Sequence, residues 1–208
     1  MEHLLEVQNL SIHFRFGAHR CAVVDEVSFH IAPGEILALV GESGCGKSLS
    51  CLALTGLTPP AAMCTAQTMR FARDGREYDL LHLTKAERRK VRGGGIAYIF
   101  QEPSASLNPV FRVGDQIAEA IALHRPDVTD RRAAVVQLLT DVGIPEPARR
   151  AAAFPHELSG GMQQRVMIAL ALAGNPELLI ADEPTTALDV TIQAQILELL
   201  TALAESRR

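Results

Sequence analysis

The apolar positions of this chain follow two kinds of pattern that are typical of strands. Residues 4–16 and 22–31 alternate roughly between apolar and polar side chains and carry Val, Ile and Phe, which predicts a pair of half-exposed strands. Three shorter runs are apolar throughout, as buried strands are. These runs are residues 36–40, 96–100 and 178–181.

Apolar residues at helical spacing mark other segments, and turn-forming residues delimit them. Gly56 follows the first such segment, Asp130 precedes a later one and Gly143 ends it. Asp74 and Gly75 predict a tight hairpin turn between two short strands. We expect helices over residues 48–55, 85–92, 114–123, 130–142 and 160–173, and a last helix whose apolar stripe covers 192–203 and which runs nearly to Arg208.

Prolines interrupt the pattern of strands and helices in the middle of the chain. They divide residues 101–166 into short helices, whereas strands and helices alternate on either side. We therefore predict an α/β fold with an N-terminal antiparallel β subdomain and an inserted α-helical subdomain. The predicted boundaries are residues 1–100 and 167–208 for the core with its β subdomain, and 101–166 for the helical subdomain.

The segment after the run 36–40 carries the strongest chemical signal. It fits G-x-x-x-x-G-K-[ST] at every fixed position and precedes a predicted helix, which is the context of a phosphate-binding loop. Glycines let backbone N–H groups close around phosphate oxygens, and a helix N-terminus favours negative charge. We expect Lys47 to reach the β- and γ-phosphates of a nucleotide and the Ser48 hydroxyl to bind Mg²⁺. The loop consists of Gly41, Glu42, Ser43, Gly44, Cys45, Gly46, Lys47 and Ser48.

A pair of acidic residues follows the third apolar run. Asp182 and Glu183 come directly after residues 178–181, and ligands of open α/β sheets bind at the carboxyl ends of strands. We expect Asp182 to hold Mg²⁺, directly or through water, and Glu183 to polarise an attacking water as a general base. Phe14, with Phe16 as second choice, is an aromatic that could stack on a base. A role in the strand core explains Phe14 equally well.

Composition narrows the class of protein. Of the 208 residues, 48% are hydrophobic and 21% charged, as in ordinary globular proteins. A net charge of -4 argues against a nucleic-acid partner, and no apolar run approaches the ~20 residues that cross a bilayer. The N-terminus lacks a basic segment, so we expect no signal peptide. The four cysteines form no C-x-x-C pair, which favours a reducing compartment over a disulfide framework or a zinc site.

A second pair of glycines opens another predicted helix. The sequence Leu158-Ser159-Gly160-Gly161 places a second anion site at a helix N-terminus. One nucleotide does not need two such sites from one chain. Two chains that face each other head to tail would need them, each covering the other's γ-phosphate.

With these motifs together, the chain resembles the ATP-binding subunit of an ABC transporter, in which Leu158 to Gly161 is the signature. The resemblance implies a P-loop ATPase fold, ATP and Mg²⁺ as ligands, and a second ATPase subunit. It implies Gln101 as the Q-loop glutamine, which senses Mg²⁺ and the membrane partner. It further implies that Glu183, Gln101 and Lys47 are catalytic and that Ser48, Gln101 and Asp182 bind Mg²⁺. Gln163 would act with the signature, and Asp189 of Ala187-Leu188-Asp189 would belong to the D-loop. Phe14 would be the adenine-stacking aromatic, which is usually a tyrosine.

Three longer blocks resemble one branch of that family, the dipeptide, oligopeptide and nickel importers. They are residues 100–110, 154–165 and 181–190. The branch implies ATP-driven import of di- or oligopeptides, with nickel or another small solute as the alternative. It also implies two transmembrane permeases, an extracytoplasmic solute-binding protein acting indirectly, and a peripheral location on the cytoplasmic face of the membrane. The loop from Gln101 to Val113 would receive a permease helix.

One feature departs from the family. The family places a switch histidine on a strand after the helix that follows the D-loop, whereas all seven histidines here precede Asp182. In related ATPases that strand lies inside the central sheet, so we expect the last core strands to be absent and apolar faces to be exposed. On this interpretation the chain is a truncated ATPase subunit, which keeps the nucleotide-site residues but hydrolyses ATP poorly or not at all.

Three other functions compete with transport-coupled hydrolysis. Soluble ABC-type ATPases that act on DNA or ribosomes usually carry long coiled-coil insertions or tandem cassettes, which this sequence does not show. A nucleotide kinase or small GTPase would give Leu158 to Gly161 no role. A nucleotide-binding subunit that does not hydrolyse ATP is the third alternative, and Lys47, Asp182 and Glu183 argue that the ancestral role was catalytic.

Overall fold

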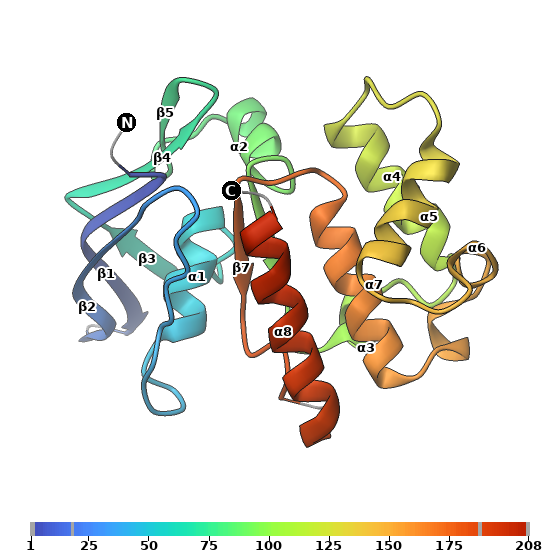
Figure 1. Cartoon of the computed structure of the whole chain (residues 1–208). Helices are drawn as coiled ribbons and strands as arrows, with labels where there is room; N and C mark the ends of the chain where they lie inside the picture. Colours follow the sequence, from blue (N-terminus) through green and yellow to red (C-terminus); the bar gives the residue numbers. More distant parts are fainter. Residues whose placement is uncertain (1–2, 18, 187–188, 207–208) are drawn as a thin grey trace. The chain divides into compact units, whose positions relative to one another are not determined.

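The computed structural model describes residues 3–17, 19–186 and 189–206. These residues form two compact units, one extending to Arg89 and the other running from Lys90 to Ser206. The two units are described separately below, and Figure 1 labels their helices and strands.

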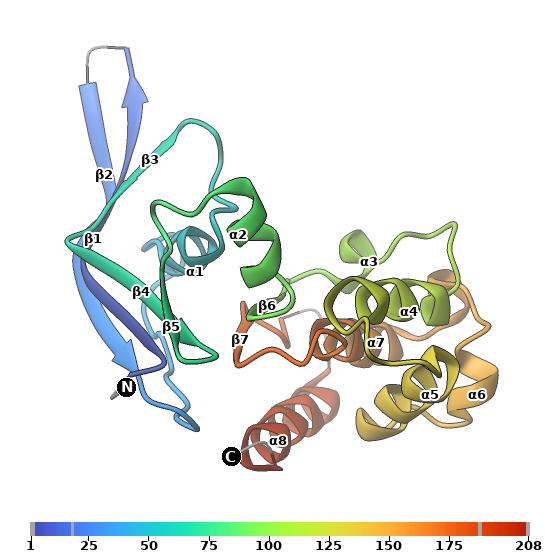
Figure 2. The same ribbon diagram turned by 90° about the horizontal axis from the view of Figure 1, so that it is seen from above.

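The first unit is built on an antiparallel sheet. Its strands are ordered β2-β1-β4-β5, and β3 also pairs with β1. The long β1–β2 hairpin is blue in Figure 2. The structure confirms the predicted strand pair. The strands are β1 (Leu5–Phe16), β2 (His19–Ile31), β3 (Ala62–Thr65), β4 (Thr68–Arg73) and β5 (Arg76–Asp79).

Alternation along β1 gives this sheet its buried face. Leu5, Val7, Leu10 and Ile12 are at most 1% exposed, and Phe71 of β4 lies opposite Leu5. At the other end of β4, the predicted turn at residues 74–75 is confirmed. Asp74 and Gly75 both have positive φ (50° and 73°), as a two-residue hairpin turn requires.

The prediction of a strand at residues 36–40 is wrong. Within the described residues this segment belongs to no strand, and Ile36 and Val40 are 59% and 92% exposed. An apolar run becomes a strand only when a neighbouring strand supplies hydrogen-bond partners, and the sheet pairings include none for this one. The helix after this segment is confirmed as α1 (Lys47–Thr55), which ends at Gly56 in the left-handed conformation.

The second unit contains a two-stranded parallel sheet and most of the helices. Strand β6 (Ile96–Ile99) pairs in register with β7 (Leu178–Ala181), which confirms both predicted buried strands. The helix α2 (Lys85–Val91) precedes β6. The helices after β6 are α3 (Pro103–Ser106), α4 (Val113–His124), α5 (Arg131–Asp141), α6 (Pro147–Arg150), the 3-10 turn Pro155–Glu157, α7 (Gly160–Leu172) and α8 (Val190–Ser206).

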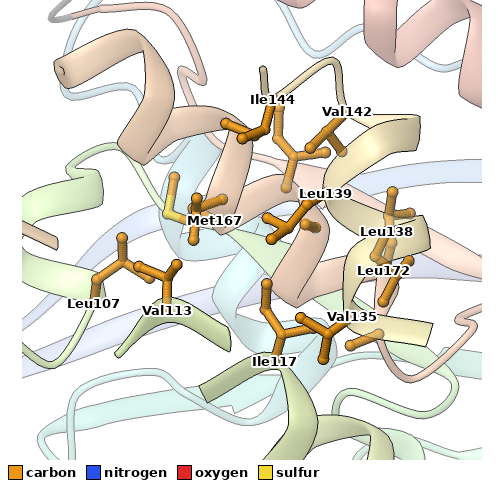
Figure 3. Packing of buried hydrophobic residues seen from close by; sticks show 14 of the residues in the cluster. Leu107, Val113, Ile117, Val135, Leu138, Leu139, Val142, Ile144, Met167 and Leu172 are labelled. Atoms are coloured by element: carbon orange, nitrogen blue, oxygen red, sulfur yellow. The ribbon is translucent and has the colours of Figure 1, made fainter. Parts of the chain in front are cut away.

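The helices of this unit pack around one apolar cluster. Figure 3 shows side chains from α4, α5 and α7 pointing toward one another, among them Ile117, Leu139 and Met167. The predicted caps are also present. The Asp130 carboxylate accepts a hydrogen bond from the Ala133 backbone N–H at 2.9 Å, and α5 starts at the next residue. This packing fixes the position of α7, whose N-terminus carries the second glycine pair.

No helix among residues 3–17, 19–186 and 189–206 is both long enough and apolar enough to cross a membrane.

Candidate functional site

The phosphate loop lies on the surface of the first unit and leads directly into α1. Gly44 and Gly46 have φ values of 82° and 94°, which only glycine adopts readily. Gly46 is the N-cap of α1, and no side chain caps this helix end. The helix N-terminus therefore presents backbone donors and a positive dipole at the loop, as an anion site requires.

The ammonium group of Lys47 folds back over the loop. Its Nζ donates to the carbonyl oxygens of Gly41 at 2.9 Å and Glu42 at 2.8 Å, and lies 3.8 Å from the Cys45 sulfur. These bonds hold a positive charge against the loop carbonyls. A Cβ on Gly41 would lie 2.7 Å from the Cys45 Sγ, so a side chain at position 41 would disturb the loop.

Gly46 is fixed by its neighbours as well as by its φ. A Cβ at this position would lie 2.7 Å from Cγ2 of Val24 and 3.0 Å from the carbonyl oxygen of Val23, both on β2. The loop therefore packs directly against the β1–β2 hairpin. Phe14 is on the same hairpin, half-buried, paired with Cys21 of β2 and Ala62 of β3. Its place within three strands fits a core role, and base stacking stays a prediction. The side chain of Phe16 lies outside the described residues.

The second unit holds the two acidic residues at the end of β7. The Asp182 backbone N–H donates to the Ile99 carbonyl at 3.0 Å and so continues the β6–β7 pairing by one residue. The Tyr98 hydroxyl donates to Oδ2 of Asp182 at 2.7 Å. The Asp182 carboxylate is thus held by the strand that carries it and by the neighbouring strand.

Glu183 has an uncommon backbone conformation, and its carboxylate accepts hydrogen bonds from two neighbouring side chains. Its φ of 45° lies in the left-handed region, which is uncommon outside glycine and often marks a functional site. Its Oε2 accepts from Nε2 of Gln101 and from Oγ1 of Thr186, both at 2.9 Å. The structure therefore brings together Gln101, Asp182 and Glu183, three of the predicted site residues. The phosphate loop belongs to the other unit.

The second glycine pair forms the start of α7, as predicted. Ser159 is the N-cap, and its Oγ accepts from the Met162 backbone N–H at 3.4 Å. A Cβ on Gly161 would lie 3.2 Å from Cγ2 of Ile192, so α7 begins in tight contact with α8. The Gln163 side chain donates to the Leu158 carbonyl at 3.2 Å and also to that of Pro155.

Asp189 is the described residue of the predicted D-loop, since Ala187 and Leu188 lie outside the described residues. Its Oδ1 accepts a hydrogen bond from the Ile192 backbone N–H at 3.0 Å. Its backbone carbonyl accepts one from the Gln193 backbone N–H. Asp189 therefore starts α8. The Gln193 side chain also donates to the Thr185 carbonyl, which ties the helix to the segment after Glu183.

Sequence reasoning missed two residues of this cluster, Tyr98 and Thr186. For Tyr98 a signal was available. In a parallel pair with β6 and β7 in register, Tyr98 lies opposite Ile180, and Asp182 follows two residues later on the same face. For Thr186 no periodic signal exists, because it lies in a turn after a residue with positive φ.

The residues present suit Mg²⁺. This ion prefers oxygen ligands and is usually held by one or two carboxylates with water and phosphates completing its shell. Within the second unit, Asp182 and Gln101 offer a carboxylate and an amide oxygen, and within the first unit Ser48 offers a hydroxyl. Among the described residues there is no cluster of three His, Cys, Asp or Glu side chains that could hold a metal.

Comparison with known proteins gives a consistent result. The family model described as "ABC transporter" matches residues 24–186. The dipeptide transport ATP-binding protein DppD of Escherichia coli is 50% identical over 203 residues, which is 97% of this chain and 61% of DppD. The oligopeptide transport ATP-binding protein OppD of Mycobacterium tuberculosis is 49% identical, over 97% of this chain and 32% of OppD. This chain thus spans about three fifths or less of the length of these relatives.

Solved structures agree with the predicted fold. The ATP-binding cassette MJ0796, in a dimeric post-hydrolysis state bound to ADP and Pi, matches with a TM-score of 0.79 and 28% identity, over 97% of this chain and 83% of that one. These matches confirm the predicted P-loop ATPase fold and the predicted family. The names of the relatives confirm the resemblance to the peptide-import branch.

Proposed function

This chain belongs to the ABC transporter family, and we propose that it binds and hydrolyses ATP to power the import of di- or oligopeptides through partner permeases. The observation that carries the proposal is the geometry of the phosphate loop. A left-handed glycine precedes α1, and the Lys47 ammonium lies over the loop carbonyls. The relatives support peptides as the transported substrate, because those with about 50% identity are named as ATP-binding proteins of dipeptide and oligopeptide transport.

Each residue of the site has a separate task in this proposal. The backbone N–H groups of the loop and Lys47 bind the β- and γ-phosphates. Ser48, Asp182 and Gln101 hold Mg²⁺, which when bound neutralises charge on the phosphate oxygens. Glu183 accepts a hydrogen bond from the attacking water and polarises it. The amide of Gln101 and the hydroxyl of Thr186 hold the Glu183 carboxylate in one orientation.

The start of α7 acts on a nucleotide bound by a second ATPase subunit. The dimeric state of MJ0796 supports this arrangement. In such a dimer Leu158 to Gly161 would cover the γ-phosphate held by the other chain, with Gln163 and Asp189 supporting the contact. Two sites would then close together, and closure would pull the permeases toward the outward-facing state.

The partners follow from the same proposal. Two transmembrane permeases, supplied by an extracytoplasmic binding protein, would carry the peptide, and this subunit would lie at the cytoplasmic face of the membrane. The contact surface would be the segment from Gln101 to Val113, where Val110 and Phe111 are 71% and 55% exposed. Nickel import and a non-hydrolysing subunit are alternatives, and the names of the relatives do not favour either.

The test measures ATP binding and hydrolysis by the purified chain and by three variants. We expect Lys47→Ala to lose ATP binding, because the loop loses its only ammonium group. Glu183→Gln should bind ATP and lose turnover. Lys85→Ala, on the surface helix α2, is the matched control and should behave as wild type. The proposal fails if the wild-type chain does not bind ATP, or if Glu183→Gln turns over as fast as wild type.

A further inference from the structure

We propose that Tyr98 is a positioning residue, which orients the Asp182 carboxylate for the metal ion. The inference rests on the proposed function, because it takes Asp182 as a residue that holds Mg²⁺. Tyr98 contacts neither nucleotide nor metal in this proposal. It acts through the hydrogen bond that its hydroxyl donates to Oδ2 of Asp182 at 2.7 Å.

The backbone places these two residues together. Strands β6 and β7 are parallel and in register, with Tyr98 opposite Ile180 and Ile99 opposite Ala181. Asp182 follows on β7 and remains bonded to β6 through its backbone N–H and the Ile99 carbonyl. Asp182 therefore cannot move along the strand without breaking a pairing bond, and the remaining freedom of its side chain is rotation.

The tyrosine is itself held in place. Its ring lies against that of Phe100 with centroids 4.6 Å apart and planes inclined by 34°. Phe100 directly follows β6 and lies two residues after Tyr98, and the ring contact shows that the two side chains lie on the same side of the chain. A hydroxyl on a restrained ring restricts the rotation of the carboxylate that accepts its hydrogen bond, and so sets the direction in which the second oxygen, Oδ1, faces.

This arrangement predicts a specific defect when the hydroxyl is removed. Tyr98→Phe keeps the ring and its contact with Phe100 but removes the hydroxyl that donates to Oδ2 of Asp182. Residues that orient metal ligands typically change metal affinity about tenfold or more when mutated. We therefore expect Tyr98→Phe to weaken divalent metal binding about tenfold while leaving metal-free nucleotide affinity unchanged. A residue that only stabilised the fold would lower both equally.

The hydrogen bond can be observed without any metal or nucleotide. The chain contains two tyrosines and no tryptophan, so a Tyr78→Phe variant emits from Tyr98 alone. A carboxylate that accepts the phenol hydrogen bond quenches tyrosine fluorescence. We expect Asp182→Asn in the Tyr78→Phe background to raise the emission, because the neutral amide is a weaker quencher. In the Tyr98→Phe background, where Tyr78 of β5 is the emitter, the same change should leave emission unaltered. If Asp182→Asn leaves Tyr98 emission unaltered, the inference is overturned.

The second measurement tests positioning. Mn²⁺ binding in the presence of a non-hydrolysable ATP analogue is followed by the electron paramagnetic resonance of free Mn²⁺, for wild type, Tyr98→Phe and Tyr78→Phe. The expected result is an approximately tenfold weaker Mn²⁺ affinity for Tyr98→Phe alone. Equal Mn²⁺ affinity for all three proteins would overturn the inference. Failure of wild type to bind ATP would instead contradict the proposed function, and the fluorescence result would still decide whether Tyr98 holds Asp182.

Discussion

The chain starts two helices with glycine-rich segments, and the two starts are built differently. At α1, Gly46 is in the left-handed conformation and no side chain caps the helix. At α7, Ser159 has extended backbone angles (φ −66°, ψ 159°) and its hydroxyl accepts a hydrogen bond from Met162. Helix α1 therefore begins with an uncapped glycine loop. Helix α7 begins with an ordinary side-chain cap followed by two glycines.

The difference indicates what each start can bind. The loop before α1 has a cationic side chain folded over it and can surround an anion within one chain. The start of α7 has its capping oxygen engaged by Met162 and its second glycine, Gly161, packed against α8. We propose that this capped helix end binds an anion that another chain presents.

The largest effect is expected at the loop before α1. Gly46→Ala combines a left-handed φ with a Cβ 2.7 Å from Val24 Cγ2 and 3.0 Å from the Val23 carbonyl. We expect a loss of about 2–4 kcal/mol in unfolding free energy. We also expect ATP affinity to fall more than about tenfold, because displaced donors lose charge-assisted hydrogen bonds. Urea unfolding and nucleotide titration measure the two effects.

Gly75→Ala provides the control for that substitution. Gly75 also has positive φ, at 73°, but a Cβ there would have no neighbour within 4 Å. Gly75→Ala should lower the unfolding free energy only through the strain of a positive φ, by about 1–2 kcal/mol, and should leave ATP affinity unchanged. If Gly46→Ala and Gly75→Ala cost the same and neither changes ATP affinity, the close packing at Gly46 does not shape the site.

A smaller effect is expected at the capped helix. Ser159→Ala removes the side-chain acceptor of Met162 and should cost about 1 kcal/mol of unfolding free energy. Asp130→Ala removes the equivalent cap of α5, so it should cost a similar amount. We expect ATP turnover to fall in Ser159→Ala and to stay at the wild-type rate in Asp130→Ala. Loss of turnover in both variants would mean that stability, and not the α7 start, limits activity.

Local patterns predicted the elements whose hydrogen-bond partners are near in the sequence or lie in another recognisable apolar run. The turn at Asp74 and Gly75 needed only two residues that tolerate positive φ. The cap at Asp130 needed only one hydrogen bond to Ala133. The runs 96–100 and 178–181 formed strands because each provides the other's hydrogen-bond partners.

The same reasoning failed where partners could not be seen in the sequence. Residues 36–40 have the composition of a buried strand, yet within the described residues they pair with no strand. The motif residues of the site were predicted by position, but their mutual contacts were not. Tyr98 and Thr186 are absent from the motifs and became visible only through the bonds to Asp182 and Glu183.

The smallest effect concerns the contact between α7 and α8. In Gly161→Ala the new Cβ would lie 3.2 Å from Cγ2 of Ile192, so this side chain must yield by a few tenths of an ångström. Replacing glycine by alanine within a helix stabilises it by roughly 0.5–1 kcal/mol, which offsets much of that cost. We therefore expect a net change in unfolding free energy within about 0.5 kcal/mol.

The second substitution isolates the contact. Ile192→Val should cost about 0.5–1.5 kcal/mol on its own, since Ile192 is partly buried against the apolar cluster. In the Gly161→Ala background it should cost less, because the shorter side chain relieves the crowding. A double-mutant cycle measures this coupling, and a coupling of zero would show that the two helices do not meet at Gly161. Because the position of the α7 start depends on that contact, Gly161→Ala should also reduce turnover while ATP affinity at the loop before α1 stays unchanged.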